Sequence, residues 1–211
     1  MQKSARELLS KTVIKIIRFF YTWRVYHYLR EKFVKLNSLW LAPEFGAFGY
    51  GNQIEKLRSL IGAKNISIGN NCYIGINAQL TAFDKFHGLN FTPKIVIGDN
   101  VSLGDSIHIT SINSITIGDG VLTGRRVTIT DHSHGRIELS EMNVPPNDRT
   151  LFSKGPVHIG NNVWIGDKAS ILAGVTIGEG CIVGANSVVT KSIPSFCVVA
   201  GVPARIIKRI K

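Results

Sequence analysis

The 211-residue sequence lacks the cysteine pattern of a disulfide-rich or zinc-dependent protein. Its three cysteines, Cys72, Cys181 and Cys197, show no CxxC spacing and cannot form an even-numbered disulfide framework. Cys72 and Cys181 both occupy the fifth position of a repeated six-residue step, where valine stands in the other repeats. We therefore expect a cytoplasmic protein with reduced cysteines, in which Cys72 and Cys181 are small buried hydrophobes and not nucleophiles.

Long charge-free apolar runs are also missing. Between residues 7 and 36 no such run exceeds five residues, as in 19–23, which is too short to span a bilayer. No small-residue cleavage site follows a clean apolar stretch, which argues against a signal peptide. The segment has no proline or glycine and mixes apolar with basic residues, so it predicts one or two basic amphipathic helices. Two alternatives stay open: peripheral contact with an anionic membrane at its inner face, or packing on the protein itself.

Most of the chain carries no excess charge of either sign. The net charge is +11, of which residues 1–36 supply +7 and residues 205–211 supply +4. Residues 37–204 have twelve basic and twelve acidic side chains. They also lack a basic patch interleaved with aromatics, so we expect no nucleic-acid partner.

A six-residue repeat dominates the second half of the sequence. Fifteen steps fall into five groups of three, and fourteen of the fifteen lead residues are Ile, Leu or Val, with Thr123 the exception. In every group glycine follows the lead of the first two steps, and a bulkier residue follows the lead of the third. The unit is therefore eighteen residues, which predicts one coil of a triangular parallel β-helix. The groups start at Ile68, Ile97, Ile117, Ile159 and Ile177.

The spacing of the groups predicts the domain organisation. The starts are 29, 20, 42 and 18 residues apart, so two inserted loops leave the helix, near 84–94 and 135–158. We expect an all-β fold of about five coils in residues 65–211, ending in a basic tail. Residues 1–64 are expected to form the N-terminal amphipathic helical extension and lead-in.

The repeats, the segment IGNNVWIG at 159–166 and the ending VVAGVPARIIKRI at 198–210 resemble the hexapeptide-repeat acyltransferases. The branch that they resemble contains the galactoside, maltose and nodulation-factor O-acetyltransferases and their polysaccharide-modifying relatives. The resemblance implies a left-handed winding, a homotrimer with active sites between subunits, and acetyl-CoA as co-substrate. It covers about residues 65–211 and excludes the N-terminal helical segment.

A histidine is expected to take the proton from the acceptor hydroxyl, because its pKa suits a base near neutral pH. The motif DHSH at 131–134 offers two candidates. His134 is preferred, because it closes its coil as the eighteenth residue, where the resembling enzymes carry their catalytic histidine. Matching the motif to the family by its local residues, DH followed by any residue and H, favours His132 instead. The residues that do not serve as the base, His132 and Asp131, are expected to orient it or bind the acceptor.

The resemblance also implies the residues that hold the substrates. Trp164 matches a tryptophan that lines the acceptor and thioester site, with an exposed packing residue as the alternative. Lys191 and Arg205 are cations that can pair with nucleotide phosphates. The positions that match the coenzyme-binding residues of the family are Asp167, Ala185, Thr190, Lys191 and Arg205. Asp167 departs from the small hydroxyl residue expected there.

The sequence therefore predicts an acetyl-CoA-dependent O-acetyltransferase that acts on a sugar or polysaccharide hydroxyl by direct attack, with no metal. N-acetylation of an amino sugar stays open. A rival from another class is a γ-type carbonic anhydrase, which holds zinc on three histidines in the same prism. The histidines available for such a site are His108, His132, His134 and His158.

Overall fold

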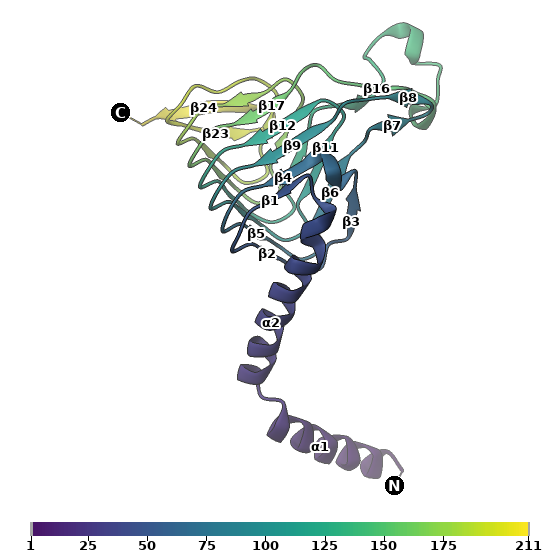
Figure 1. The fold of residues 1–211 in the computed structure, drawn as a ribbon, viewed down its shortest axis with the longest axis vertical. Coiled ribbons are helices and arrows are strands. Elements are labelled where there is room, and N and C mark those ends of the chain that lie inside the picture. Colours follow the sequence, from purple (N-terminus) through teal and green to yellow (C-terminus); the bar gives the residue numbers. More distant parts are fainter. Residues whose placement is uncertain (1, 211) are drawn as a thin grey trace.

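The computed structural model describes residues 2–210 and shows a three-sided solenoid with two helices that project below it in the view of Figure 1. Helix α1 spans Gln2–Phe20 and helix α2 spans Trp23–Leu41. Thr22 caps the second helix, because its hydroxyl accepts a hydrogen bond from the amide of Val25 at 3.3 Å. The amphipathic segment is therefore two helices, which begin and end beyond the expected residues 7–36.

The two helices relate differently to the solenoid. The C-terminal half of α2 docks on strand β2 (Gln53–Ile54): Ser38 Oγ accepts from the amide of Ile54 at 2.7 Å, and Asn37 donates to its carbonyl at 2.9 Å. Arg30 pairs with the nearly buried carboxylate of Glu55. Helix α1 extends away from the strands (Figure 1). Within residues 2–210 no helix is long and apolar enough to cross a membrane.

Three sheets form the sides of the solenoid, and all their pairings are parallel except β23 with β24. The first sheet contains β1 (Ala47–Phe48), β4 (Ile66–Ile68), β9 (Lys94–Ile97), β12 (Ser114–Ile117), β17 (Val157–Ile159) and β20 (Thr176–Ile177). The second contains β2, β5 (Tyr73–Ile74), β10 (Ser102–Leu103), β13 (Leu122–Thr123), β18 (Trp164–Ile165), β21 (Ile182–Val183), β23 (Cys197–Gly201) and β24 (Ala204–Arg209). The third contains β3 (Ser59–Ile61), β6 (Gln79–Ala82), β11 (His108–Ser111), β14 (Thr128–Thr130), β19 (Ser170–Ile171) and β22 (Val188–Val189).

The sheets begin earlier than the repeat pattern. Strands β1, β2 and β3 lie within the segment expected as a lead-in, and each pairs in parallel with the first repeat strand of its side. Short 3₁₀ turns, η1 (Ala42–Glu44) and η2 (Ala63–Asn65), flank these strands. The sheets therefore join strands from before and after residue 65, and the division of the chain at that residue stays a prediction.

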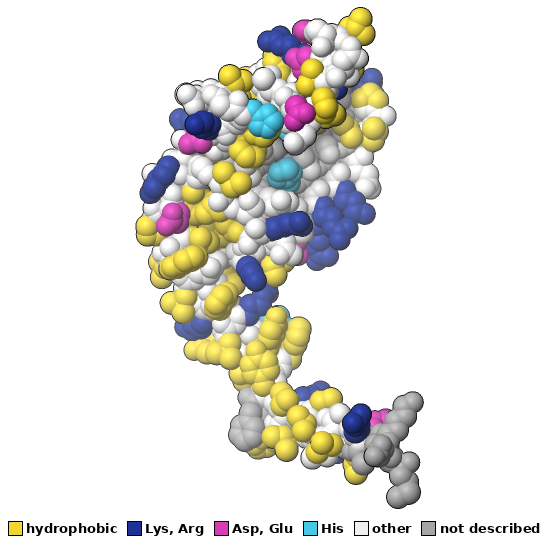
Figure 2. Space-filling model, turned by 90° about the vertical axis from the view of Figure 1, so that its right-hand side faces the viewer, with side chains coloured by type: hydrophobic (Ala, Val, Ile, Leu, Met, Phe, Trp, Pro, Cys, Tyr) yellow, Lys and Arg dark blue, Asp and Glu magenta, His cyan; other side chains and the backbone are white. Residues whose placement is uncertain are grey.

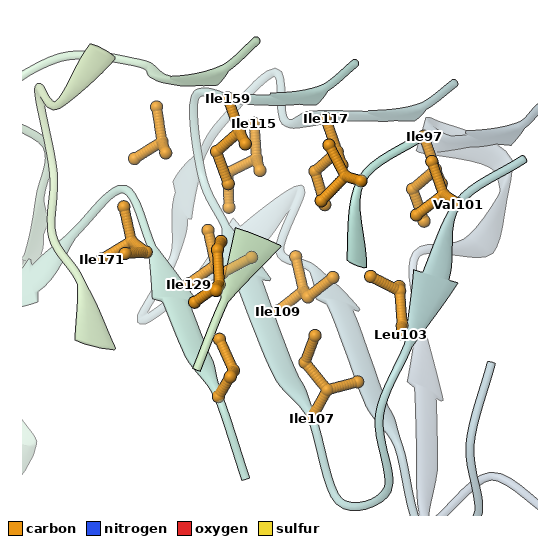
Figure 3. Packing of buried hydrophobic residues seen from close by; sticks show 14 of the residues in the cluster. Ile97, Val101, Leu103, Ile107, Ile109, Ile115, Ile117, Ile129, Ile159 and Ile171 are labelled. Atoms are coloured by element: carbon orange, nitrogen blue, oxygen red, sulfur yellow. The ribbon is translucent and has the colours of Figure 1, made fainter. Parts of the chain in front are cut away.

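The lead residues of the repeat fill the interior. Ile97, Ile117 and Ile159 stack from layer to layer on one side, and Ile109, Ile129 and Ile171 do so on another (Figure 3). Thr123, the exception in the pattern, is 3% exposed, and its hydroxyl accepts a hydrogen bond from the amide of Gly104 at 2.9 Å. All three cysteines are buried and free, as expected for Cys72 and Cys181.

The glycines after the lead residues allow the layers to approach closely. A Cβ at Gly98 would lie 2.3 Å from Oδ1 of Asp119 in the next layer. That same oxygen accepts a hydrogen bond from the amide of Asp99 at 2.8 Å. The contact recurs one layer on, where Asn161 Oδ1 accepts from the amide of Asp119 at 2.9 Å. Glycine is needed here because a side chain would displace this ladder of carboxylates and amides.

Candidate active site

Two loops leave the solenoid and meet at one place. The first contains a hairpin of β7 (Lys85–Phe86) and β8 (Leu89–Asn90). The second leaves after β14 and forms an antiparallel pair of β15 (Ser133–His134) and β16 (Leu151–Phe152), with 3₁₀ turns η3 (Leu139–Glu141) and η4 (Pro146–Asp148) between them. Both lie on the same side of the solenoid in Figure 1. The loops therefore surround the DHSH motif.

A cavity of about 340 Å³ opens at this place, between the second loop and the third sheet. Both histidines of the motif line it, and so does Thr190, the residue after β22. The full lining is Thr130, His132, Ser133, His134, Gly135, Arg136, Ile137, Met142, Arg149, Lys154, Leu172, Ala173 and Thr190. The structure thus brings together three of the residues that the sequence singled out, two as catalytic and one as coenzyme-binding.

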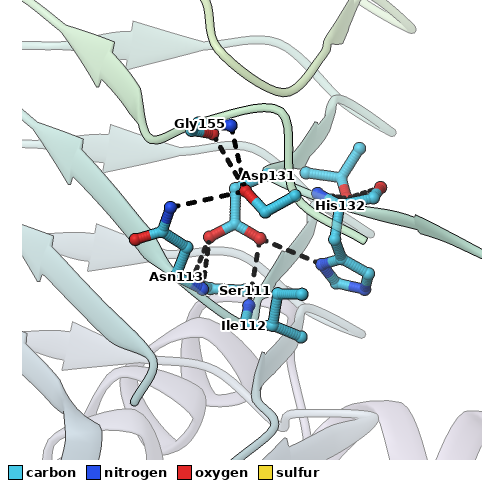
Figure 4. Close-up of polar contacts among 8 residues, drawn as sticks. Ser111, Ile112, Asn113, Asp131, His132 and Gly155 are labelled. Carbon is cyan, nitrogen blue, oxygen red and sulfur yellow. Dashed lines mark hydrogen bonds and ion pairs between the residues drawn. The ribbon is translucent and has the colours of Figure 1, made fainter. Parts of the chain in front are cut away.

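Asp131 is the buried acceptor at the centre of the polar contacts of the site (Figure 4). It is fully buried, and its carboxylate accepts hydrogen bonds from the hydroxyl of Ser111 at 2.5 Å and from the amides of Ile112 and Asn113, both at 3.0 Å. Nδ1 of His132 lies 3.0 Å from its Oδ1. Burial by itself would raise the pKa of Asp131, but the hydrogen bonds from His132, Ser111 and the two amides outweigh it and hold that pKa below its ordinary value.

The contact with Asp131 determines how His132 can act. An ionised carboxylate only accepts hydrogen bonds, so Nδ1 of the neutral imidazole carries the proton and Nε2 is the basic nitrogen. The His132 side chain is 7% exposed, and its ring meets that of Phe83 edge-on at 6.3 Å. The ring is therefore held by a buried acceptor on one side and faces the cavity as a base of fixed orientation.

His134 is placed differently. It lies on β15, opposite Leu151, and its side chain is exposed. Its ring meets that of Phe86 edge-on at 5.7 Å, and Phe86 also stacks on His87 at 4.1 Å. His134 lines the same cavity, but no carboxylate among the described residues orients its ring.

The buried carboxylate predicts a pH dependence of folding. Because the pKa of Asp131 is lower in the folded protein than its ordinary value of 3.8, this residue stabilises the fold above that value and stops doing so as the pH falls through the folded pKa. We expect Asp131→Asn to lower the free energy of unfolding at neutral pH, and to lose less stability than the parent protein between about pH 5 and about pH 2. Urea titrations at a series of pH values measure this, and parallel pH profiles would contradict it.

Trp164 and Asp167 lie away from this cavity. Trp164 is on β18 in the second sheet, is 52% exposed, and is not among the residues that line the cavity. Asp167 accepts a hydrogen bond from the amide of Arg125 at 3.0 Å, the same contact between layers that Asp119 and Asn161 make. The structure therefore gives Asp167 a place in the turns of the solenoid.

The remaining coenzyme candidates lie at the C-terminal layers. Lys191 and Arg205 line a second cavity of about 340 Å³, together with Ser192, Ile193, Val199, Ala204 and Ile206. Both cations are exposed, as is Ala185 in the turn after β21. Thr190 lines the histidine cavity, and Lys191, the next residue in the chain, lines the second one.

The sequence reasoning missed three cations of the histidine cavity. Arg136, Arg149 and Lys154 all come from the second loop. The repeat count located that loop but assigned nothing to its side chains, because a segment outside the repeat has no register that fixes where a residue points. Their only signal was that three basic residues occupy one inserted loop.

Metal ligands do not gather in the described part of the chain. No group of three or more His, Cys, Asp or Glu side chains within it is placed to hold a metal ion. His108 and His158, the further histidines of the carbonic anhydrase alternative, lie on β11 and β17, which belong to different sheets.

Comparison with known proteins agrees with this architecture. Residues 156–191 match the family model described as bacterial transferase hexapeptide (six repeats). WbbJ of Escherichia coli K12, whose provisional name assigns it to lipopolysaccharide biosynthesis as an O-acetyl transferase, is 45% identical over 149 residues, 69% of this chain and 72% of the relative. The galactoside O-acetyltransferase of the same organism is 34% identical over 181 residues, 83% of this chain and 79% of the relative.

A solved structure supports the fold. AntD, an N-acyltransferase from Bacillus cereus solved with dTDP and 3-hydroxybutyryl-CoA, superimposes with a TM-score of 0.66 at 24% identity, covering 83% of this chain and 88% of AntD. The family match and the two O-acetyltransferase relatives define the class as transferases built from six-residue repeats. The chain belongs to the hexapeptide-repeat transferase family, and it is an acetyltransferase.

Proposed function

We propose that this protein transfers an acetyl group from acetyl-CoA to a hydroxyl of a sugar or polysaccharide. The observation that carries the proposal is the Asp131–His132 pair, a buried carboxylate that orients an imidazole at the wall of a cavity. Both relatives are named for O-acetyl transfer, which favours a hydroxyl as the acceptor group over the amine of an amino sugar. The left-handed winding, the five coils and the division into 1–64 and 65–211 belong to the same proposal.

The proposed reaction is direct transfer within a ternary complex. Nε2 of His132 removes the proton of the acceptor hydroxyl as its oxygen attacks the thioester carbonyl. The tetrahedral oxyanion then collapses, the carbon–sulfur bond breaks, and the proton on the imidazolium neutralises the departing thiolate. Asp131 stabilises the imidazolium between these two steps and stays ionised. His134, preferred by its position in the coil, is the alternative base, and variants at both residues separate the two.

The substrates are proposed to occupy these two cavities. The thioester lies in the histidine cavity beside Thr190, and the phosphates of the coenzyme lie against Lys191 and Arg205, in the second cavity. Asp167, already bonded to a backbone amide, and the exposed Ala185 would border the pantetheine arm. We propose a homotrimer, in which the exposed Trp164 would serve a cavity of a neighbouring copy.

Release of free thiol from acetyl-CoA tests this function. We would incubate the protein with acetyl-CoA and a panel of saccharides and amino sugars, and measure both free thiol and the mass of the products. Acceptor-dependent thiol release together with an ester-linked acetyl group would support the proposal. Transfer to amino groups alone would replace it by N-acetylation, and no transfer to any saccharide would refute it.

We also propose that the protein is cytoplasmic and that α1 lies on the inner face of an anionic membrane. Residues 6–19 carry four basic side chains and one acid, and their aliphatic side chains stand exposed. Figure 2 shows such apolar side chains gathered along the helices at the bottom of the view, away from the solenoid. The exposed aliphatics of α1 are Leu8, Leu9, Val13, Ile14, Ile16 and Ile17. A helix of this kind binds at the headgroup boundary through both its charges and its apolar side chains.

Vesicle binding provides the measurement. Because each basic residue near an anionic surface contributes about 1 kcal/mol, reversing Lys11, Lys15 and Arg18 to Glu should weaken binding to phosphatidylglycerol vesicles by at least roughly a hundredfold. The matched control reverses three exposed lysines outside the two helices, Lys85, Lys94 and Lys168. Equal recovery of parent and α1 variant with the vesicles would refute the membrane proposal.

A further inference from the structure

The cations of the histidine cavity are separated from the acids of the same loop. Arg136, Arg149 and Lys154 line the cavity, whereas Glu138, Glu141 and Asp148, the loop's three carboxylates, are absent from the lining. The loop is neutral as a whole. Its positive charges therefore line the space beside the catalytic histidine candidates, and its carboxylates do not line it, although that of Glu141 lies at the edge beside Gly135 and the Arg149 side chain.

The carboxylates nearest to these cations leave much of the positive charge unpaired. Glu138 is 3.9 Å from the guanidinium of Arg136, and both side chains are more than half exposed. Glu141 accepts from the backbone amide of Arg136 at 2.8 Å and not from its side chain. Such exposed pairs interact weakly in water.

Arg149 and Lys154 have no carboxylate partner among the described residues. Nε of Arg149 donates to the carbonyl of Val144 at 2.8 Å, which holds this half-buried side chain at the cavity without neutralising it. The side chain of Lys154 is exposed and makes no ion pair with a described residue. Arg136 stacks over the ring of Phe152 at 4.0 Å, so its guanidinium is also held in place.

We propose that this cavity selects an anionic acceptor, a sugar that carries a carboxylate or a phosphate. The inference rests on the proposed acetyl transfer and adds the substrate class. The anionic group lies against Arg149 and Lys154, and the hydroxyl to be acetylated lies at Nε2 of His132. A guanidinium matches the geometry of either oxyanion with paired hydrogen bonds.

The coenzyme's own phosphates are the rival ligand for these cations. In acetyl-CoA the pantetheine arm separates the thioester from the phosphates, so a base at the thioester does not lie beside the phosphate sites. Lys191 and Arg205 in the second cavity already provide cations for them. The three cations also come from the inserted loop, whereas the coenzyme candidates Thr190 and Lys191 come from the coils.

Direct binding to the full-length protein tests the inference independently of catalysis. We would measure by calorimetry the affinities of matched sugars: galactose against galacturonate and galactose 6-phosphate, and glucose against glucuronate and glucose 6-phosphate. We expect a charged member to bind roughly tenfold to a hundredfold more tightly than its neutral partner, as is typical when one or two charged hydrogen bonds are added. The double variant Arg149→Gln/Lys154→Gln should lose this preference, and the control Lys94→Gln should keep it.

The two hypotheses fail in different ways. Equal affinities for charged and neutral sugars in every pair would overturn the anionic acceptor, whatever the rate of thiol release. A KM for acetyl-CoA that rises in the double variant, with the preference for charged sugars unchanged, would also overturn it, because the cations would then serve the coenzyme. A preference for charged sugars without thiol release would refute the transferase proposal alone. Comparing the affinities of the uronates with those of the sugar phosphates identifies which oxyanion the cavity prefers.

Discussion

Replacing His132 by alanine is expected to reduce acetyl transfer by about a hundredfold to ten-thousandfold, the usual contribution of a general base. The reason is geometric. His132 is the histidine whose Nδ1 is held by the buried Asp131 at 3.0 Å, which leaves Nε2 as a base of fixed orientation at the cavity. The measurement is the steady-state rate of thiol release at saturating acetyl-CoA, with circular dichroism to show that the variant is folded.

His134→Ala is the matched control, because His134 lines the same cavity on an exposed strand without a carboxylate partner. We expect a much smaller loss of rate in this variant. Near-normal turnover in His132→Ala beside an inactive His134→Ala would assign the base to the histidine that closes the coil. Asp131→Asn should retain the fold at neutral pH and lower the rate, since the amide can present an N–H to the ring and disfavour the productive tautomer.

The second large effect is expected in the core of the solenoid. Ile129→Ala removes a fully buried side chain that lies between Ile109 and Ile171 in adjacent layers. Truncations of this kind cost about 2–5 kcal/mol, because the surrounding layers close the cavity only in part. We expect the free energy of unfolding, measured by urea denaturation, to fall by this amount.

Ile207→Ala serves as the matched control for Ile129→Ala. Ile207 lies on β24 and is 65% exposed, so its truncation should change stability by no more than about 0.5 kcal/mol. A loss of stability in Ile129→Ala no larger than that in Ile207→Ala would show that the stacked aliphatic side chains are not the source of stability. Hydrogen bonds along the stack would then have to supply it.

Repetition made the interior predictable from the sequence. Each lead residue has the same environment in every layer, so a pattern of Ile, Leu and Val at every sixth position identifies the core without any knowledge of long-range contacts. Thr123 broke the pattern, and only the structure shows why it is tolerated: its hydroxyl bonds to the amide of Gly104. The Asp and Asn residues that follow the glycines were also visible in the sequence, but their role as bridges between layers was not.

The site was less predictable because it lies where the repeat stops. The motif DHSH gave the two candidate histidines, and the register of the coil favoured His134. Which ring is oriented by a carboxylate depends instead on where Asp131 points. Asp131 is buried because Ser111, Ile112 and Asn113, which precede it by 18 to 20 residues, turn their donors toward it. The coil spacing places Asp131 over Ser111 of the preceding layer, but it does not tell which donors the carboxylate accepts from or that they bury it.

The sequence by itself determined the eighteen-residue unit, the positions of the two inserted loops, the buried cysteines and the basic, apolar character of the N-terminal segment, since each of these follows from local periodicity or composition. The tertiary structure alone decided which histidine is paired with a buried carboxylate, which cations face the cavity, and that α1 stands apart from the solenoid while α2 docks on it. The physical reason is that these properties depend on contacts between segments far apart in the chain, and outside the repeat no periodicity encodes such contacts.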